Sequence, residues 1–219
     1  MNIQKHEVLQ RISDLGVVGI IIAKDVEDGV SSAEAVFEGG IDVLEISVSH
    51  PCALEIMVEI AERGRCKGAT LGNGAVTDAL SARRCIDAGA EFIGSFFFDD
   101  GVARVCNRAG VAYLPGVGSI TEIGRAMEYG VDVVRAYPGD VLGPRFIKAA
   151  STAIPTARVM PLGGVAPVNL DDWFQSGAFA VVGGSGLLRP TGVEGDYQAI
   201  AKTAEHVVTQ IALIRACLE

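Results

Sequence analysis

Short runs of β-branched and apolar residues alternate with longer amphipathic stretches along the chain, and glycine or proline stands at most of the changes. Apolar runs that are each followed by a stretch with helical spacing are typical of repeated βα units. The pattern predicts eight strands, over 17–23, 43–48, 69–76, 92–98, 112–117, 132–137, 158–162 and 179–183.

The stretches between these runs have helical spacing, and several end on glycine, which accepts the left-handed turn at a helix C-terminus. Clear examples are VEDGVSSAEAVFEGG, TDALSARRCIDAG, SITEIGRAMEYG and VNLDDWFQSG. Ser119 and Asn169 are predicted N-caps, and Glu122 follows Ser119 at the spacing of a capping box.

Eight parallel strands joined by right-handed helical crossovers close most simply into a barrel. We therefore predict an α/β fold, a single (β/α)8 TIM barrel, with residues 1–219 as one domain. An open doubly wound sheet is the alternative. If the chain forms a barrel, its chemistry belongs at the C-terminal ends of the strands, where the βα loops gather.

Composition restricts the partners. A hydrophobic fraction of 49% suits a sizeable core, and a net charge of -9 offers no basis for broad binding to nucleic acid or to an anionic membrane surface. Without an apolar signal core or a run long enough to cross a bilayer, a cytoplasmic protein is expected.

The five cysteines form no Cys-x-x-Cys pair and are expected to be reduced. No histidine, cysteine or carboxylate cluster has metal-ligand spacing, so neither a metal nor another cofactor is predicted.

Glycines stand at the ends of the seventh and eighth predicted strands, as Gly163-Gly164 and as the segment 183–186. Barrels commonly bind phosphate there through backbone N–H groups. We predict phosphate contacts from Gly163, Gly164, Gly184 and Ser185, with the serine hydroxyl as a further donor. The alternative is that these glycines only form tight turns.

Several longer stretches are similar to one family of barrels. They are AVFEGGIDVLEIS, GNGAVTDA, DAGAEFI, LPGVGSITEI, RAYPGDVLGPRFIKA, PLGGVAPVNLDDWF and VVGGSGLL. On these motifs the chain, from about Val17 to Leu188, resembles the 2-keto-3-deoxy-6-phosphogluconate (KDPG) and 4-hydroxy-2-oxoglutarate aldolase family. The resemblance implies a class I aldolase-like barrel, lyase activity, a phosphorylated small-molecule substrate and a homotrimer.

In that family a sixth-strand lysine attacks the ketone of the substrate and forms an iminium, and a strand-two glutamate moves protons. The glutamate matches Glu45, within VLEIS. The family's K-x-F-P pattern reads RAYP here, so Arg135 replaces the lysine and Tyr137 matches the aromatic residue. Because a guanidinium stays protonated, Arg135 cannot form the imine.

Other positions that surround the substrate in the family also differ. Ala75 stands where a threonine is usual, and Phe96 lies within the segment that replaces the fourth-strand proline. Ile22 and Ser49 align with arginines of many relatives. We predict that Ser49, Ala75, Phe96 and Tyr137 contact the substrate, and that the substrate has changed.

Arg135 has two interpretations. It could bind a substrate carboxylate or phosphate, or it could form an ion pair with Glu45 across the barrel. Lys24 is the only lysine considered as a displaced Schiff-base former, and a solvated surface role is the simpler interpretation. His50, just past strand two, is a candidate for proton transfer.

These residues lead to three functional hypotheses. The first is an enzyme that acts on a phosphorylated small keto or sugar acid, with Glu45 and Arg135 in the catalytic site. Within it, cleavage competes with isomerisation or epimerisation of a phosphosugar by Glu45. The second is a non-catalytic phosphometabolite-binding protein, and the third is a conventional aldolase.

Overall fold

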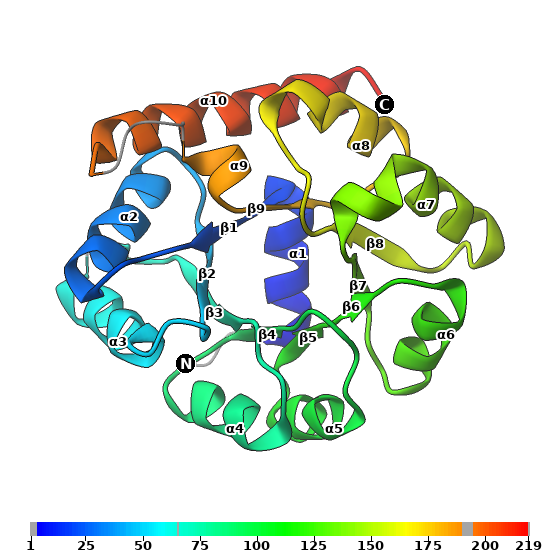
Figure 1. Ribbon diagram of the computed structural model, residues 1–219, viewed down its shortest axis with the longest axis horizontal. Coiled ribbons are helices and arrows are strands. Elements are labelled where there is room, and N and C mark those ends of the chain that lie inside the picture. The colour runs from blue at the N-terminus through cyan, green and yellow to red at the C-terminus, as the bar shows by residue number, and fades with distance from the viewer. Residues whose placement is uncertain (1–3, 65, 190–194, 219) are drawn as a thin grey trace.

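The computed structural model describes residues 4–64, 66–189 and 195–218. Strands and helices alternate along these segments, and the helices surround a ring of strands (Figure 1). The elements are α1 (Lys5–Leu15), β1 (Val17–Ile21), α2 (Val26–Glu38), β2 (Val43–Ser47), α3 (Ala53–Arg63), β3 (Thr70–Gly74), α4 (Ala79–Asp87), β4 (Phe92–Gly94), α5 (Asp100–Ala109), β5 (Ala112–Leu114), β6 (Gly116–Val117), α6 (Ile120–Glu128), β7 (Val133–Ala136), α7 (Gly139–Ala153), β8 (Arg158–Pro161), η1 (Pro167–Asn169), α8 (Leu170–Gln175), β9 (Val181–Gly183), α9 (Ser185–Leu188) and α10 (Tyr197–Ala216).

The strands pair in parallel within two sheets. One has the order β5-β4-β3-β2-β1-β9, and the other has the order β6-β7-β8. The two sheets adjoin at Pro115, which separates β5 from β6, and at an isolated parallel bridge between Leu162 and Val182. The arrangement is that of a TIM-barrel-like α/β protein.

All eight predicted strand regions contain a strand, but one of them is divided. The region 112–117 becomes β5 and β6 because Pro115 has no N–H to give to the ladder. Its carbonyl still accepts a hydrogen bond from Arg135 N at 2.7 Å. The prediction of one closed eight-stranded sheet is therefore met only in part, since the strands pair as two sheets.

The two predicted helix caps have different outcomes. Ser119 caps α6, where its Oγ accepts a hydrogen bond from Glu122 N at 3.3 Å. Asn169 stands at the predicted N-cap position of α8, but its side chain makes no cap bond to that helix. Asn169 instead accepts from Ala166 N at 2.9 Å and donates to Gly164 O at 2.8 Å, so it braces the loop that follows β8.

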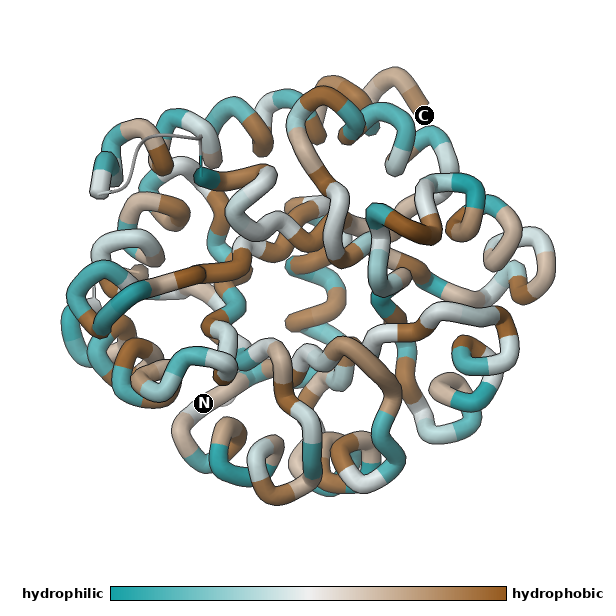
Figure 2. Tube along the Cα trace, in the orientation of Figure 1, coloured by the Kyte–Doolittle hydropathy of each residue, from teal (hydrophilic) through white to brown (hydrophobic). Residues whose placement is uncertain are grey.

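Two hydrophobic clusters hold the fold together. The larger lies between the strands and the surrounding helices, and the smaller fills the ring of strands. Val8, Leu9 and Ile12 of α1 belong to the inner cluster, so α1 covers one end of the ring. Figure 2 shows the hydrophobic positions concentrated on the strands and on the helix faces turned toward them.

The described helices include none that is both long enough and apolar enough to cross a membrane. The five cysteines are free thiols. Burial raises the pKa of Cys106 to about 12 and the pKa values of Cys66 and Cys85 to about 11 each, so these three thiols are poor nucleophiles.

Candidate active site at the C-terminal ends of the strands

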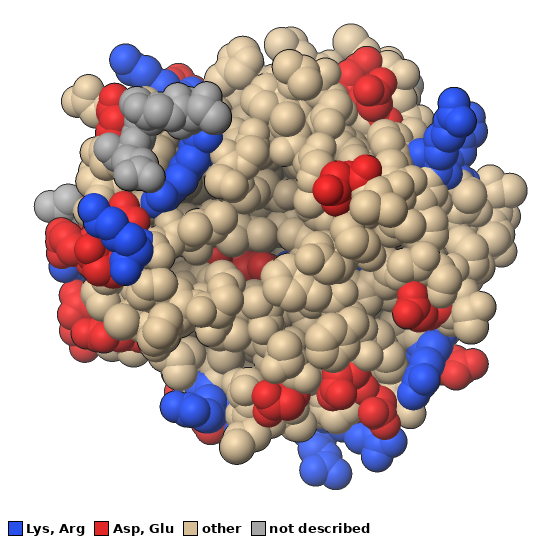
Figure 3. Space-filling model, viewed as in Figure 1, with Lys and Arg blue, Asp and Glu red and all other residues tan. Residues whose placement is uncertain are grey.

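A cavity of about 340 Å³ opens at the C-terminal ends of β1, β2 and β3. Its lining consists of Ile20, Ile21, Ile22, Ala23, Glu45, Ile46, Ser47, Ser49, His50, Ile56, Ala75 and Phe96. We call it the mouth cavity. Figure 3 shows a hollow near the centre of this face with acidic atoms in it, and Glu45 is the only acidic residue among the described residues of the lining. Four predicted residues, Glu45, Ser49, Ala75 and Phe96, therefore meet in one cavity.

Arg135 and Glu45 form a buried ion pair across the barrel. Arg135 Nη1 donates to Glu45 Oε1 at 3.0 Å, and Arg135 Nη2 donates to Glu45 Oε2 in a second, shorter contact. The side chains are 1% and 3% exposed, respectively. Of the two interpretations of Arg135, the ion pair is the arrangement present in the structure. Arg135 does not line the mouth cavity, so Glu45 lies between it and an entering ligand.

Two glycines leave room for this ion pair. An added Cβ at Gly74 would overlap the Glu45 carboxylate, and an added Cβ at Gly94 would overlap the Arg135 guanidinium. Neither glycine has a positive φ, so space and not backbone conformation demands glycine here. The sequence interpretation missed both residues. A glycine inside a strand often marks a place where another group packs closely against the backbone, and that signal could have identified Gly74 and Gly94.

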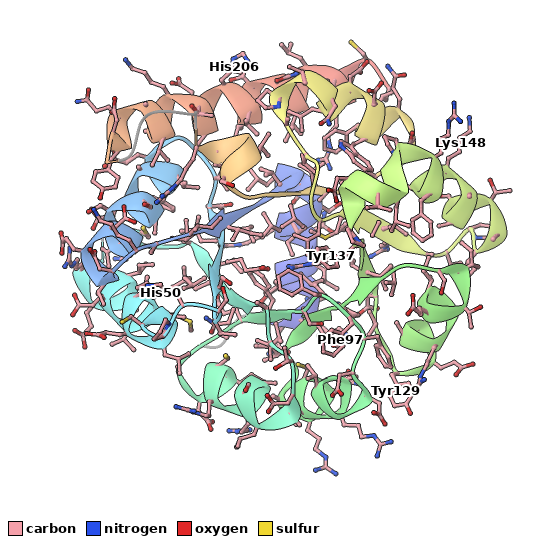
Figure 4. All side chains as sticks on the ribbon, in the orientation of Figure 1. His50, Phe97, Tyr129, Tyr137, Lys148 and His206 are labelled. Atoms are coloured by element: carbon pink, nitrogen blue, oxygen red, sulfur yellow. The ribbon has the colours of Figure 1, made fainter. Side chains whose placement is uncertain are left out.

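Phe96 and Tyr137 stack at the rim of the mouth cavity. Their ring centroids are 4.8 Å apart, and Phe96 remains 40% exposed. Tyr137 lies near the centre of the strand ring (Figure 4), although it does not line the cavity itself. The predicted substrate-contact residue Tyr137 therefore faces Phe96 instead of the cavity floor.

A buried hydroxyl network fixes the loop that carries Phe96. Ser95 Oγ donates to Phe97 O at 2.6 Å and lies 2.9 Å from the Tyr113 hydroxyl, which also accepts from Asp99 N at 3.1 Å. Burial raises the pKa of Tyr113 to about 12, although the hydrogen bonds with Ser95 and Asp99 N oppose that rise. Tyr113 therefore stays protonated and structural at neutral pH.

No lysine of the chain lines the mouth cavity. Lys24, Lys67, Lys148 and Lys202 are exposed, and Figure 4 shows Lys148 at the periphery of the ring. Lys5 pairs with Asp132 at 2.6 Å beside α1, at the opposite end of the barrel. The idea that Lys24 replaces the missing nucleophile gains no support from this placement.

His50 lines the cavity, but both of its ring nitrogens have partners. Nε2 lies 3.0 Å from Lys24 O, and Nδ1 accepts from Cys52 N at 3.2 Å. A carbonyl on one side and an N–H on the other fit the neutral tautomer that carries its proton on Nε2. His50 thus connects the loop after β1 with the start of α3, which leaves no free nitrogen for proton transfer.

The glycine-rich ends of β8 and β9 lie side by side. Leu162 bridges to Val182, and an added Cβ at Gly186 would lie 3.3 Å from Val165 O. Gly163 and Gly164 have positive φ values of 94° and 69°. An added Cβ at Gly164 would lie 2.7 Å from Asp140 Cα, so this glycine also serves the packing of α7.

Backbone donors are nevertheless available at these two loops. Within the described part of the chain, no hydrogen bond engages the N–H groups of Gly163, Gly164, Ser185 or Gly186. Gly184 and Ser185 border a small niche whose other walls include Ile22, a residue that also lines the mouth cavity. Gly184 and Ser185, two of the four predicted phosphate residues, are therefore adjacent to the cavity that contains Glu45. Among residues 4–64, 66–189 and 195–218, no group of three histidine, cysteine or carboxylate side chains could hold a metal ion.

Known proteins share this architecture and sequence pattern. The KDPG and KHG aldolase profile matches residues 8–203. The 2-dehydro-3-deoxy-phosphogluconate aldolase of Treponema pallidum is 30% identical over 210 residues, which cover 95% of this chain and 98% of that protein.

Solved structures agree. The Zymomonas mobilis KDPG aldolase with 3-phosphoglycerate superposes with a TM-score of 0.82 and 26% identity, covering 92% of this chain and 96% of that one. The Legionella pneumophila KDPG aldolase, with pyruvate captured as a covalent carbinolamine, gives a TM-score of 0.84 at 23% identity, covering 94% and 99%. The chain belongs to the KDPG and KHG aldolase family.

Proposed function

We propose that this chain binds a phosphorylated small keto acid, sugar acid or sugar, and acts on it by proton transfer through Glu45. The single observation that carries the proposal is the buried Glu45–Arg135 ion pair, in which Arg135 stands where the family resemblance implies a lysine. Cleavage, which family membership favours, and isomerisation or epimerisation both need a proton carrier beside a carbonyl compound. Glu45 is the group of the mouth cavity that can serve as a base.

Imine chemistry is the pathway that this site does not support. It needs an uncharged amine next to the substrate carbonyl, and no lysine lines the mouth cavity. Arg135 offers no such amine because its guanidinium remains protonated.

The phosphate end of the proposal rests on the paired glycine loops. Within the described residues, the N–H groups of Gly163, Gly164, Ser185 and Gly186 have no hydrogen-bond partner and can donate to an anion. Arg189 lines the niche beside Gly184 and Ser185. A crystal grown with phosphate is expected to contain the anion between Gly164 and Ser185. An empty position at saturating phosphate would contradict this assignment.

Borohydride trapping tests the absence of imine chemistry. The protein is incubated with pyruvate and borohydride, and its intact mass is measured, with the Legionella aldolase as positive control. We expect no adduct on this chain. A stable adduct would overturn the claim and would identify the lysine that forms it by peptide mapping.

Deuterium exchange tests proton transfer directly. Ketose and aldose phosphates in heavy water are expected to gain deuterium next to the carbonyl with the wild-type chain and to gain none with Glu45→Gln. A non-catalytic metabolite-binding protein is the second candidate, because both Glu45 oxygens already accept hydrogen bonds from Arg135. Thermal stabilisation by a phosphosugar without any exchange would favour that candidate.

We further propose that the chain works as one closed (β/α)8 barrel domain, with β5 and β6 as the two halves of a single strand. The bridge between Leu162 and Val182 and the Arg135 N to Pro115 O bond support this closure. A cytoplasmic homotrimer, as the family resemblance implies, is part of the same proposal. Sedimentation velocity measures the trimer directly.

A further inference from the structure

The charged residues that line the mouth cavity are not those expected of a site that binds a carboxylic acid. Among the described residues that line it there is no lysine or arginine, and Glu45 is the only carboxylate. The Arg135 guanidinium lies behind Glu45, with both terminal nitrogens bound to that carboxylate. Within the mouth cavity an entering group therefore meets Glu45 and no described cation, although the adjoining cavity, which shares Ser49 and Phe96 with it, is also lined by Arg84.

A ligand carboxylate would be poorly placed here. It would lose water in a partly enclosed, largely apolar cavity and would lie next to a carboxylate of the same charge. The apolar walls, which include Ile22, Ile56 and Phe96, offer no donor to compensate. Like-charge juxtaposition of this kind excludes ligands effectively.

The polar atoms of the cavity suit a hydroxyl group better. Glu45 can only accept hydrogen bonds while it is ionised, and each serine hydroxyl can both donate and accept. Ser47 Oγ and Ser49 Oγ lie 2.7 Å apart on the same wall. An alcohol could donate to Glu45 and accept from one of these serines.

We infer that the ligand end that enters the mouth cavity carries a neutral hydroxyl or carbonyl group and no carboxylate. The inference rests on the proposed phosphate-binding function and narrows its ligands to sugar phosphates. Ile22 borders both the mouth cavity and the niche beside Gly184 and Ser185, so the glycine-rich loop after β9 adjoins the mouth cavity.

Two phosphate esters of the same length test the inference. Glycerol 3-phosphate and 3-phosphoglycerate share the phosphate and differ in whether the far carbon is an alcohol or a carboxylate. Titration calorimetry at pH 7.5 is expected to give a dissociation constant at least about tenfold lower for glycerol 3-phosphate. Equal affinity, or tighter binding of 3-phosphoglycerate, would overturn the inference but would leave the phosphate site standing. Binding of neither ester, nor of inorganic phosphate, would instead remove the proposed function on which it rests.

A variant that adds a positive charge at the rim of the mouth cavity provides a second test of the inference. Ser49 is exposed and lines the cavity, so Ser49→Arg adds a cation there without disturbing the core. This variant is expected to bring the affinity ratio of the two esters to about one or to reverse it. Thr156→Arg, an exposed position just before β8 at the other end of the barrel, is the matched control and should leave the ratio unchanged. An unchanged ratio in Ser49→Arg would overturn the inference.

Measuring both affinities at several salt concentrations separates repulsion by Glu45 inside the cavity from repulsion by the net charge of the protein. That net charge of -9 also disfavours the more anionic ester. Long-range repulsion is screened over about 8 Å at physiological ionic strength and over shorter distances at higher salt. A preference set by Glu45 inside the cavity should persist in strong salt. Its disappearance there would assign the preference to overall charge and contradict the inference.

Discussion

Arg135 fills the space that Gly94 leaves open, because a Cβ at position 94 would lie 2.8 Å from Arg135 Cζ. Gly74 has the same relationship to the other member of the ion pair, since its added Cβ would lie 2.6 Å from Glu45 Cδ. Residues of four strands, β2, β3, β4 and β7, thus form one packed polar unit at the top of the barrel interior.

We expect Gly94→Ala to lower the free energy of unfolding by about 1–3 kcal/mol, because the new methyl group overpacks a site already filled by the guanidinium. Urea denaturation measures the change. Gly124→Ala is the control, since position 124 lies in α6 with no atom within 4 Å of an added Cβ. That variant should be neutral or more stable by up to about 1 kcal/mol. Equal stability of Gly94→Ala and wild type would contradict the packing of this unit.

A double-mutant cycle tests the ion pair itself. Arg135→Met and Glu45→Leu should each lower the free energy of unfolding by about 3–5 kcal/mol, because each leaves the other charge buried without its partner. The double variant should lose much less than the sum, since it removes both charges. Additive losses would show that the two groups do not interact.

We expect Arg135→Lys to fold and to show little KDPG cleavage in a coupled pyruvate assay. The new ammonium would pair with Glu45, and the cavity still lacks a cation for the pyruvate carboxylate. Adding Ser49→Arg and Ala75→Thr to this variant should increase cleavage. The expectation fails if Arg135→Lys alone reaches within about tenfold of the Treponema pallidum relative assayed in parallel.

Asp28 is expected to make the free energy of unfolding depend on pH in the acid range. Burial alone would raise the pKa of Asp28, but hydrogen bonds from Lys24 N at 3.0 Å and from the Tyr197 hydroxyl at 3.1 Å, together with Arg189, lower it overall. A carboxyl whose pKa is lower in the folded state stabilises the fold above its unfolded-state pKa, about 3.9, and loses that contribution as the pH falls through the folded value.

Asp28→Asn should therefore lower the free energy of unfolding by about 1.5–3 kcal/mol at pH 7. The difference from wild type should shrink as the pH falls below about 4, where the Asp28 carboxyl of the unfolded state becomes protonated, and should be smallest once the folded carboxyl is protonated too. Urea denaturation between pH 3 and 7 measures both effects. Glu128→Gln, at an exposed position on α6, should differ little from wild type, and a deficit for Asp28→Asn that is constant with pH would refute the charge-based explanation.

Much of the fold could be predicted because the hydrophobic pattern determines which segments become strands. Pro115 limited that prediction, since a proline at the middle of a strand interrupts the ladder where the residue pattern still reads as continuous. The position of Asn169 at the N-cap of α8 was predicted, but its hydrogen-bond partners were not. Its amide finds partners in the loop after β8, and the spacing of the residues does not reveal that tertiary contact.

The sequence indicated which residues gather at the candidate site, but it did not indicate how their side chains pair. Glu45, Ser49, Ala75 and Phe96, which the family-like motifs singled out, all line the mouth cavity, and their contacts with a substrate stay a prediction. The sequence left two partners open for Arg135, because pairing across a barrel depends on strand positions that are distant in the chain. His50 shows the same limit, since only the structure reveals that both ring nitrogens are engaged.

The glycines at positions 74 and 94 also have a consequence for the history of the family. A side chain longer than lysine at position 135 needs the space that Gly94 leaves open, whereas Gly74 leaves room for Glu45. The arginine and Gly94 should therefore vary together among related sequences. In sequences with an arginine at position 135, the space and charge around the guanidinium would limit which residues can surround it. In relatives with a lysine there, the requirements of imine formation would limit the same positions. Covariation of these positions would mark the descendants of this change without any assay.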